Sequence, residues 1–371
     1  MNVAVLGAGG TIAPAIVRDL AESDEVTALR LLDIDLERAE AVAREHGAGK
    51  ADARQADAAS NLAEHLEGVE VLVNSAAYRI NIAAMRACLD AGCHYMDLGG
   101  LYHVTAEQLK LSGEFEEAGR LALLGIGSAP GKTNLLAARA VKELTGAPIS
   151  ISVLAAGRDL QPTGELSFPY ALRTLLDEIV MPPMAIVNGK PQEMKPLQEG
   201  PRHDFGDPIG EAETILTLHS EVLTFGESFG APNVTFALSL PPAVLESLKE
   251  LAGASEERIA EVARSASPPS ANTVAIHVVE VTGPDTVIRA RSVTSPNKDW
   301  GLGGGIVSTA SPAAAAVRLL ARGSITKTGA LPPESCIDPA EMFAELEGRG
   351  VRIDVSSKPI EKAATLSTRT A

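Results

Sequence analysis

The chain has 371 residues, a formal net charge of −16 and an aromatic content of 3%. This length allows two domains with separate cores, and the negative charge predicts repulsion from nucleic acids and anionic membranes. The first strand pattern begins at Asn2, and no apolar run reads as long enough to span a bilayer. We therefore expect a cytoplasmic protein that binds a small molecule, with no nucleic-acid or membrane partner.

The first 35 residues have the order strand, glycine-rich turn, helix and strand, and the second strand ends in a carboxylate. These parts are residues 2–6, Gly7 with Gly9 and Gly10, 11–21, and 28–32 followed by Asp33. This order predicts a dinucleotide site. A glycine turn with a purely structural role is the alternative.

Each part of this segment has a separate expected duty. Gly7 permits a tight turn, and Gly9 lets the backbone approach a pyrophosphate. The helix that begins near Thr11 presents unpaired N–H groups and the positive end of its dipole to phosphates. Ile12 stands where such motifs have a third glycine. Gly10 or Ala13 must therefore provide the close packing of helix on strand.

Asp33 predicts the preferred coenzyme. A carboxylate at this strand end can accept both ribose hydroxyls of NAD. It would repel each unit of charge on the 2′-phosphate of NADP by about 3 kcal/mol, at about 5 Å and an effective dielectric of about 20. This favours NAD. Arg38, five residues on, could bind that phosphate and leaves NADP open.

Strand and helix patterns continue to alternate after Asp33. We expect a helix at 36–46, a strand and turn at 52–58, a helix that ends at 66, a strand at 69–74 and a helix at 82–91. Such alternation predicts a doubly wound parallel sheet of the Rossmann type. Asp57 either approaches the adenine or lies in a solvated loop. Ser75 and Ala76 follow the strand over 69–74, where a nicotinamide ribose would lie.

The next strand, over 94–98, delivers Asp97 to the carboxyl edge of the sheet, and His103 follows. Residues at that edge face the ligand crevice, so both are candidate acid–base groups. The alternatives are that Asp97 caps the next helix and that His103 lies in a solvated loop.

A strand over 121–126 leads through the turn 127–133 into a helix over 134–141. The Gly-Lys-Thr ending of the turn resembles a phosphate-binding P-loop. That motif needs a glycine where Ile126 stands, and Pro130 removes a backbone N–H. We keep a nucleotide-hydrolysing P-loop only as a third alternative, which binding of a nucleotide with magnesium would support.

From residue 149 the pattern changes to alternating strands with few helices between them. We expect strands at 150–155, 185–187, 212–217, 234–240, 273–281 and 286–293, and helices at 245–251 and 256–265. This predicts an α+β domain with a mainly antiparallel sheet. Ser311 and Pro312 read as the N-cap and first turn of a helix that ends at Arg322.

The expected domains are a Rossmann domain over 1–135 and an α+β substrate and dimerisation domain over 136–310. A C-terminal helix and strand over 311–355 would pack back on the first domain, and a polar tail over 356–371 would be disordered. Cys88, Cys93 and Cys336 have neither disulfide nor zinc spacing, so we expect reduced thiols and no metal site.

Several segments together resemble the saccharopine dehydrogenase superfamily, with the lysine 6-dehydrogenase branch closest. They are VAVLGAGGTI, LLDIDLERA, HYMDLGG, LALLGIGSAPGKTNLLA, IVNGK and LPPE, and the likeness extends to about residue 356. The resemblance implies a Rossmann domain paired with an α/β substrate domain, a homodimer, and NAD- or NADP-dependent chemistry at a carbon–nitrogen bond of an amino acid. Saccharopine reductases carry an acidic residue where Ala129 stands, and the segment around His219 and Glu221 departs from the lysine branch.

Amine oxidation by hydride transfer needs the neutral amine, and a lysine-like amine is only about 0.04% neutral at pH 7. Asp97 or His103 would take the proton. Lys132 or Arg158 would hold a substrate carboxylate, and Asn134 would bind its amino group. A dinucleotide-binding protein without turnover is the alternative from another functional class.

Overall fold

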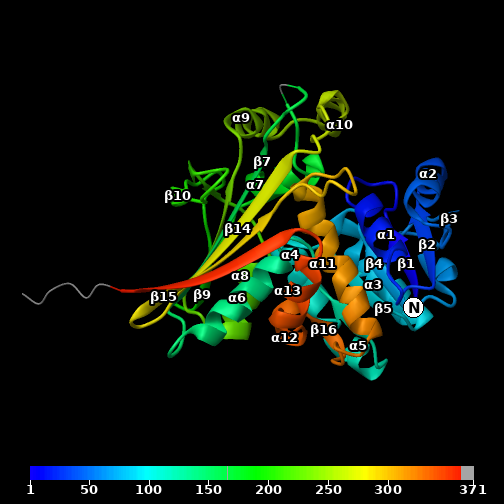
Figure 1. The fold of residues 1–371 in the computed structure, drawn as a ribbon, viewed down its shortest axis with the longest axis horizontal. Helices are drawn as coiled ribbons and strands as arrows, with labels where there is room; N and C mark the ends of the chain where they lie inside the picture. Colours follow the sequence, from blue (N-terminus) through cyan, green and yellow to red (C-terminus); the bar gives the residue numbers. More distant parts are fainter. Residues whose placement is uncertain (165, 361–371) are drawn as a thin grey trace, which may run out of the picture.

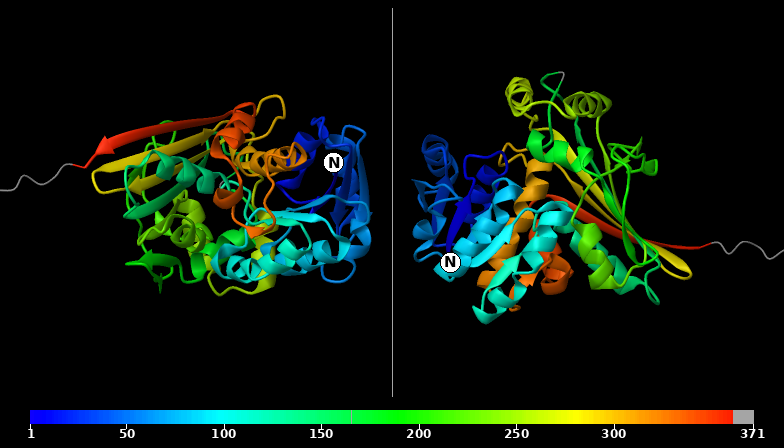
Figure 2. Two further views of the ribbon diagram at one scale, coloured as in Figure 1. Left: turned by 90° about the horizontal axis from the view of Figure 1, so that it is seen from below. Right: turned by 180° about the vertical axis from the view of Figure 1, so that it is seen from behind.

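A computed structural model of the chain describes residues 1–164 and 166–360. Two sheets lie side by side, a parallel one with helices on both faces and a longer, mainly antiparallel one (Figure 1). The views from below and from behind show the same separation (Figure 2). The predicted fold class, a Rossmann domain with a second α+β domain, is confirmed.

The first sheet has seven strands, all parallel. In spatial order they are β16 (Gly329–Leu331), β6 (Leu121–Leu123), β5 (His94–Asp97), β4 (Val71–Asn74), β1 (Asn2–Leu6), β2 (Ala28–Asp33) and β3 (Ala51–Gln55). Val3 and Val5 of β1 are buried towards one face, and Ala4 and Leu6 towards the other. Both faces are apolar because both are covered by helices.

The helices of this domain divide between the two faces of the sheet. One face carries α1 (Ala13–Ala21), α2 (Leu36–His46), α11 (Gly304–Ala321) and α13 (Pro339–Glu347). The other carries α3 (Asn81–Ala91) and α5 (Ser112–Glu117), with α4 (Leu101–Leu109) packed on α3 and short 3-10 turns at Leu62–Leu66 and Tyr78–Ile80. Asp35 accepts a hydrogen bond from the Arg38 N–H and so caps α2, as its sequence predicts.

The second sheet is mixed, with one parallel pair among antiparallel ones. Its order is β17 (Val351–Pro359), β15 (Thr286–Thr294), β14 (Thr273–Thr282), β7 (Ser150–Asp159), β13 (Val234–Ser239), β8 (Met184–Val187) and β9 (Lys190–Glu193), and β12 (Ile215–Leu216) also pairs with β13. The expected disorder from residue 356 is wrong for 356–359, which continue β17 and pair with β15. Residues 361–371 lie outside the described part of the chain.

One face of the second sheet packs on α6 (Lys132–Glu143), α7 (Leu172–Val180) and α8 (Glu221–Phe229). The opposite face is covered by the short hairpin of β10 (His203–Asp204) and β11 (Glu211–Ala212), which inserts Phe205. Helices α9 (Pro242–Leu251) and α10 (Glu256–Ser265) lie at one end of the sheet, and α12 (Pro333–Cys336) packs on α6.

The prediction that a helix begins at Ser311 is wrong, because α11 begins at Gly304 and holds Pro312 in its interior. A Cβ on Gly304 would lie 2.2 Å from the Thr294 carbonyl oxygen, so a glycine there lets the helix start against β15. By length and composition alone α11 could cross a membrane, contrary to our expectation of no such run. Within the protein, 72% of it is buried.

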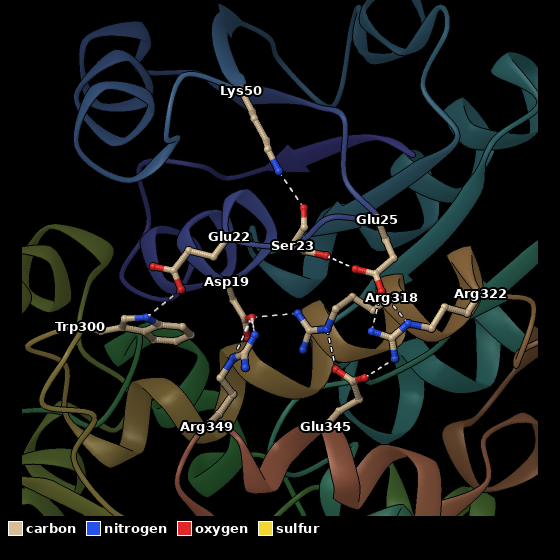
Figure 3. Close-up of polar contacts among 10 residues, drawn as sticks. All are labelled: Asp19, Glu22, Ser23, Glu25, Lys50, Trp300, Arg318, Arg322, Glu345 and Arg349. Atoms are coloured by element: carbon tan, nitrogen blue, oxygen red, sulfur yellow. Dashed lines mark hydrogen bonds and ion pairs between the residues drawn. The ribbon is translucent and has the colours of Figure 1, made fainter.

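Helix α11 is joined to α1 and α13 by a buried ion cluster, shown in Figure 3. Asp19 on α1 is fully buried, and its Oδ1 accepts from Arg318 Nη1 at 2.8 Å and from Arg349 Nη2 at 2.6 Å. Arg318 Nε also donates to Glu345 Oε2 at 2.6 Å. Opposite charges on residues far apart in sequence therefore hold α1, α11 and α13 together.

Candidate active site

A cavity of about 850 Å³ lies between the carboxyl edge of the first sheet and the second sheet. The first domain lines it with the glycine turn and the ends of β2, β4 and β5. The second lines it with residues of β7, β13 and β14 and of the segment around α7. Eight of the nine predicted coenzyme-binding residues line this cavity: Gly7, Gly9, Gly10, Thr11, Ile12, Asp33, Ser75 and Ala76.

The glycine turn lies so close to neighbouring residues that side chains would not fit, and it lines the cavity. Gly7 has φ +74°, and a Cβ there would lie 2.8 Å from the Ala76 backbone. A Cβ on Gly9 would lie 2.7 Å from Arg38 Cβ. Helix α1 starts at the fully buried Ala13, and the N-cap residue Ile12 provides no side-chain cap. Open N–H groups beside a glycine cradle fit the diphosphate of a dinucleotide.

The ribose end of this cradle is marked by Asp33. Its Oδ2 accepts from the Gly9 N–H at 2.8 Å, and its Oδ1 accepts from the Asp35 N–H at 2.9 Å. Arg38 also lines the cavity and pairs through Nε with Asp35 Oδ2 at 3.3 Å. Ser75 Oγ is buried without a protein partner, so it is available to a ligand hydroxyl. These groups fit an adenosine ribose and a nicotinamide ribose.

Asp57, the ninth residue, does not line the cavity. It is exposed, its Oδ1 accepts from the Ala59 N–H at 2.9 Å, and its own N–H donates to Asn61 Oδ1. The proposed contact of Asp57 with adenine is therefore corrected to a local turn, which was the alternative from sequence.

Asp97 is buried and does not line the cavity. Its carboxylate accepts five hydrogen bonds, from the backbone N–H groups of Gly99 and Gly125 and from the side chains of Tyr95, Asn81 and Gln108. Burial raises the pKa of Asp97 despite these bonds. The prediction that Asp97 is a base is corrected, because its oxygens already fix the sheet edge.

His103 and Asn134 are also placed away from the cavity. His103 is exposed on α4, with its ring edge-on to that of Tyr102. Asn134 is buried, and its Oδ1 accepts from the Gly131 N–H while its Nδ2 donates to Glu334 Oε2 at 2.7 Å. His103 as a base and Asn134 as a substrate ligand are therefore not supported, and Asn134 caps the turn before α6.

The turn 127–133 is closed by its own backbone. The Gly127 N–H donates to the Pro130 carbonyl and the Lys132 N–H to the Gly127 carbonyl, both at 2.9 Å. The Thr133 hydroxyl donates to Glu221 Oε1 at 2.8 Å. A P-loop needs such N–H groups free for phosphate, so this geometry argues against that alternative.

Lys132 is fully buried and does not line the cavity. Its Nζ lies 3.0 Å from Thr294 Oγ1 and 2.6 Å from Ser308 Oγ. Neither partner is acidic, and burial lowers the pKa of Lys132 to about 7. The direct contact of Lys132 with substrate that we predicted is thus corrected.

Two further residues line the cavity, Ser128 and His277, and the sequence did not indicate either as a site residue. Hydrogen bonds connect them to Lys132 through Ser308. Ser128 Oγ is 2.7 Å from Ser308 Oγ and 3.0 Å from His277 Nε2. His277 Nδ1 is buried without a partner, and burial, with Lys132 and His219 nearby, lowers the pKa of His277 well below its usual value. The available signal was a histidine in the middle of the apolar run 274–279.

A second buried histidine faces the cavity from the segment before α8. His219 stacks on Phe236 with ring centroids 3.5 Å apart. Its Nε2 is 3.7 Å from Glu178 Oε2 and its Nδ1 is 3.4 Å from Glu221 Oε2. Burial opposes the charged ring, yet these two carboxylates raise the pKa of His219 to about 9. The side chain is therefore an imidazolium at neutral pH.

Arg158 is the predicted substrate ligand that does line the cavity. Its guanidinium donates only to neutral acceptors, the Gly157 carbonyl and the carbonyl and hydroxyl of Ser239. By contrast, the neighbouring guanidiniums of Arg79 and Arg173 both pair with Asp177. Among the residues that the structure describes, Arg158 has no ion pair with a carboxylate, so its positive charge is available to a ligand. No group of three or more potential metal ligands occurs among residues 1–164 and 166–360.

Comparison with known proteins agrees with this geometry. The model of the saccharopine dehydrogenase NADP binding domain family matches residues 3–123. Carboxyaminopropylagmatine dehydrogenase of Synechocystis sp. is 28% identical over 151 residues, a stretch that spans 38% of this chain and only 38% of that relative.

Among solved structures, the apo histidine-tagged saccharopine dehydrogenase (L-Glu forming) of Saccharomyces cerevisiae superposes with a TM-score of 0.71 and 16% identity. The match covers 96% of this chain and 99% of that one, and at this identity it shows a shared fold. Taken together, the three matches confirm the resemblance to the saccharopine dehydrogenase superfamily that the sequence motifs indicate.

Proposed function

We propose that this protein of the saccharopine dehydrogenase superfamily is an NAD-dependent oxidoreductase that acts on a carbon–nitrogen bond of an amino acid or amine. One observation carries the proposal. A single cavity joins the glycine turn and Asp33 to Arg158 and His277 of the second domain. A coenzyme and a small charged substrate could therefore meet in it.

The bound nicotinamide ring would supply or accept the hydride. Side chains of the protein bind the substrate and transfer its proton. Arg158, which donates to neutral acceptors within the described part of the chain, holds a substrate carboxylate through charge-assisted hydrogen bonds. The imidazolium of His219 lies between two carboxylates and offsets one of their two negative charges.

Proton transfer is assigned to Ser128 and His277, in place of the two residues predicted from sequence. Both line the cavity and hydrogen-bond to each other. An ammonium substrate must lose a proton before hydride can leave the adjacent carbon, since only a nitrogen lone pair stabilises the developing cation. A hydroxyl–imidazole pair can accept that proton.

The test is NADH formation by the wild-type protein across diamines, lysine analogues and secondary amines of amino acids at high pH. We expect oxidation of at least one carboxylate-bearing amine. Arg158→Gln should raise its KM by roughly 100-fold, as for loss of a charged hydrogen bond worth about 3 kcal/mol. Arg139→Gln, on the exposed surface of α6, is the matched control and should leave KM unchanged.

Two results would count against the proposal. Tight NADH binding without turnover of any amine would instead support a dinucleotide-binding protein. Equal KM values for wild type and Arg158→Gln would remove the assigned carboxylate site.

A further inference from the structure

The hydrogen-bonded groups that run from the cavity to Lys132 form an unbroken chain. Lys132 Nζ contacts Ser308 Oγ at 2.6 Å, Ser308 Oγ contacts Ser128 Oγ at 2.7 Å, and Ser128 Oγ contacts His277 Nε2 at 3.0 Å. The four residues come from α6, α11, the turn before α6 and β14. Only the Ser128 and His277 end lines the cavity.

Each hydroxyl in this chain can donate one hydrogen bond and accept others, so the chain has two directions. When Lys132 is charged, Nζ donates to Ser308, Ser308 to Ser128, and Ser128 to His277 Nε2. When Lys132 is neutral, Ser308 donates to Nζ and Ser128 to Ser308. Ser128 then accepts from the cavity or from His277. The same distances between heavy atoms allow both arrangements. Protonation of Lys132 therefore reverses the direction of the hydrogen bonds as far as Ser128.

We infer that Ser128 and Ser308 relay the proton released by a substrate ammonium to the buried amine of Lys132. In this step the substrate N–H bond breaks and an O–H bond forms on Ser128. The Ser128 proton passes to Ser308, and the Ser308 proton forms an N–H bond on Lys132. The net change is a neutral substrate amine and a lysine ammonium. The inference rests on the proposed function, because it supplies the neutral amine which that reaction needs.

The surroundings of Lys132 allow its amine to accept and release a proton near neutral pH. Its Nζ touches only hydroxyls, and burial brings the pKa down to about 7. The titratable groups on neighbouring elements include His277 and Glu280 on β14, His219 before α8, Glu221 and Glu227 on α8, and Glu334 and Cys336 on α12. Of these, His277, His219, Glu221 and Glu334 hydrogen-bond or pair with other side chains: Ser128, the carboxylates beside His219, Thr133 and Asn134.

The remaining elements around α6 add no titratable contact to Nζ. β15 presents Thr294 and α11 presents Ser308, and neither titrates. Helix α13 packs near Arg139 and Glu143, which pair with each other. Lys132 acts through two serines and does not touch the cavity, so its test must read proton transfer rather than activity alone.

The first experiment is an NMR titration of the full chain without coenzyme, with ¹³C-labelled lysine and ¹⁵N-labelled histidine. Lys132→Met assigns the Lys132 signal, which we expect to titrate near pH 7. The ring signals of His277 should move with the same midpoint in wild type. In Ser308→Ala that coupling should disappear. A Lys132 signal that titrates near its ordinary value of about 10.4, or a coupling that survives in Ser308→Ala, overturns the relay.

The second experiment is the pH dependence of kcat/KM for an amine that the panel identifies. Wild type should lose about tenfold per pH unit below the Lys132 midpoint, where the lysine is already charged. Ser308→Ala should lose this limb, and Ser308→Thr, which keeps a hydroxyl, should restore it. Thr294→Val removes the Nζ contact outside the chain, so it should move the limb to lower pH without abolishing it. A limb unchanged in Ser308→Ala contradicts the inference.

Failure of the relay and failure of the proposed function are distinguishable. If no amine is oxidised, the proposed function fails, and the coenzyme-free titration still decides whether Lys132 and His277 are coupled. If amines are oxidised but the two residues titrate independently, the proposed function stands and the relay is wrong.

Discussion

Two buried sites differ in how they stabilise charge inside the protein. Behind the coenzyme cradle, Asp19 lies between Arg318 and Arg349, so each charge is held by an opposite one (Figure 3). Beside the cavity, Lys132 is equally buried but contacts only hydroxyls. The first arrangement keeps its charges fixed, whereas the second lets the amine lose its proton near pH 7.

The difference separates structural from chemical use of buried charge. A compensated cluster joins α1, α11 and α13, because each of its buried charges is paired with an opposite one. An uncompensated lysine costs stability when charged and is therefore able to exchange a proton.

The largest expected effect lies in the compensated cluster. Asp19→Ala leaves the guanidiniums of Arg318 and Arg349 without their central carboxylate, and it should lower the free energy of unfolding by about 3–5 kcal/mol. Glu143→Ala, which breaks an exposed pair with Arg139, is the control and should cost under about 1 kcal/mol. Urea denaturation measures both. Similar losses for the two variants would mean that burial of the cluster adds nothing.

Asp33 extends the comparison to a carboxylate at the cavity rim, where its charge faces a ligand. Asp33→Ala should reduce the preference for NADH over NADPH by about 10- to 100-fold, since repulsion of the 2′-phosphate is removed. Fluorescence titration with both coenzymes measures the ratio of Kd values. A ratio that does not change would show that Asp33 does not select the coenzyme.

Lys132 should make the protein more stable as pH rises. Its folded pKa of about 7 lies below the unfolded value of about 10.4, so the unfolded chain binds more protons between these values. The free energy of unfolding should therefore increase from pH 7 to about 10 through this residue. Lys132→Met should lack the increase, which urea denaturation at several pH values can detect. Parallel curves for wild type and variant would exclude a lowered lysine pKa.

His219 should make the free energy of unfolding decrease as pH rises, which is opposite to the effect of Lys132. The net effect should be smaller, because burial offsets part of the attraction of His219 to Glu178 and Glu221. Its pKa is raised to about 9 from an unfolded value of about 6.5, so its contribution is fully present below pH 6.5 and is lost as pH rises through 9. In His219→Gln the unfolding free energy should fall less over this range than in wild type. A steeper fall in the variant would contradict the imidazolium assignment.

The coenzyme side of the site could be predicted from sequence because its signals are local. Gly7, Gly9 and Asp33 are fixed by a turn, a helix start and a strand end within 33 residues, and all three line the cavity. The same reasoning explains why helix α2 and its cap Asp35 could be predicted. The homodimer and the cytoplasmic location stay predictions.

On the substrate side only Arg158 was placed in the cavity as predicted; the other groups depend on contacts between distant segments. Asp97 stands at the expected sheet edge, yet its bonds to Gly125 and Gln108 turn it into a buried structural group. Lys132 meets Ser308 across 176 residues of sequence. Ser311 and Pro312 resemble a helix start, but the contact of Gly304 with β15 allows the helix to begin about two turns earlier.

The most direct test of the account is calorimetric titration of the purified wild-type protein with NADH and NADPH, repeated for Gly9→Val with its folding checked by circular dichroism. We expect saturable binding of one NADH per chain, weaker binding of NADPH, and loss of both in the variant, whose side chain would collide with Arg38 and displace Asp33. Absence of saturable binding of either coenzyme to the wild type, or equal binding by a folded Gly9→Val, would contradict it.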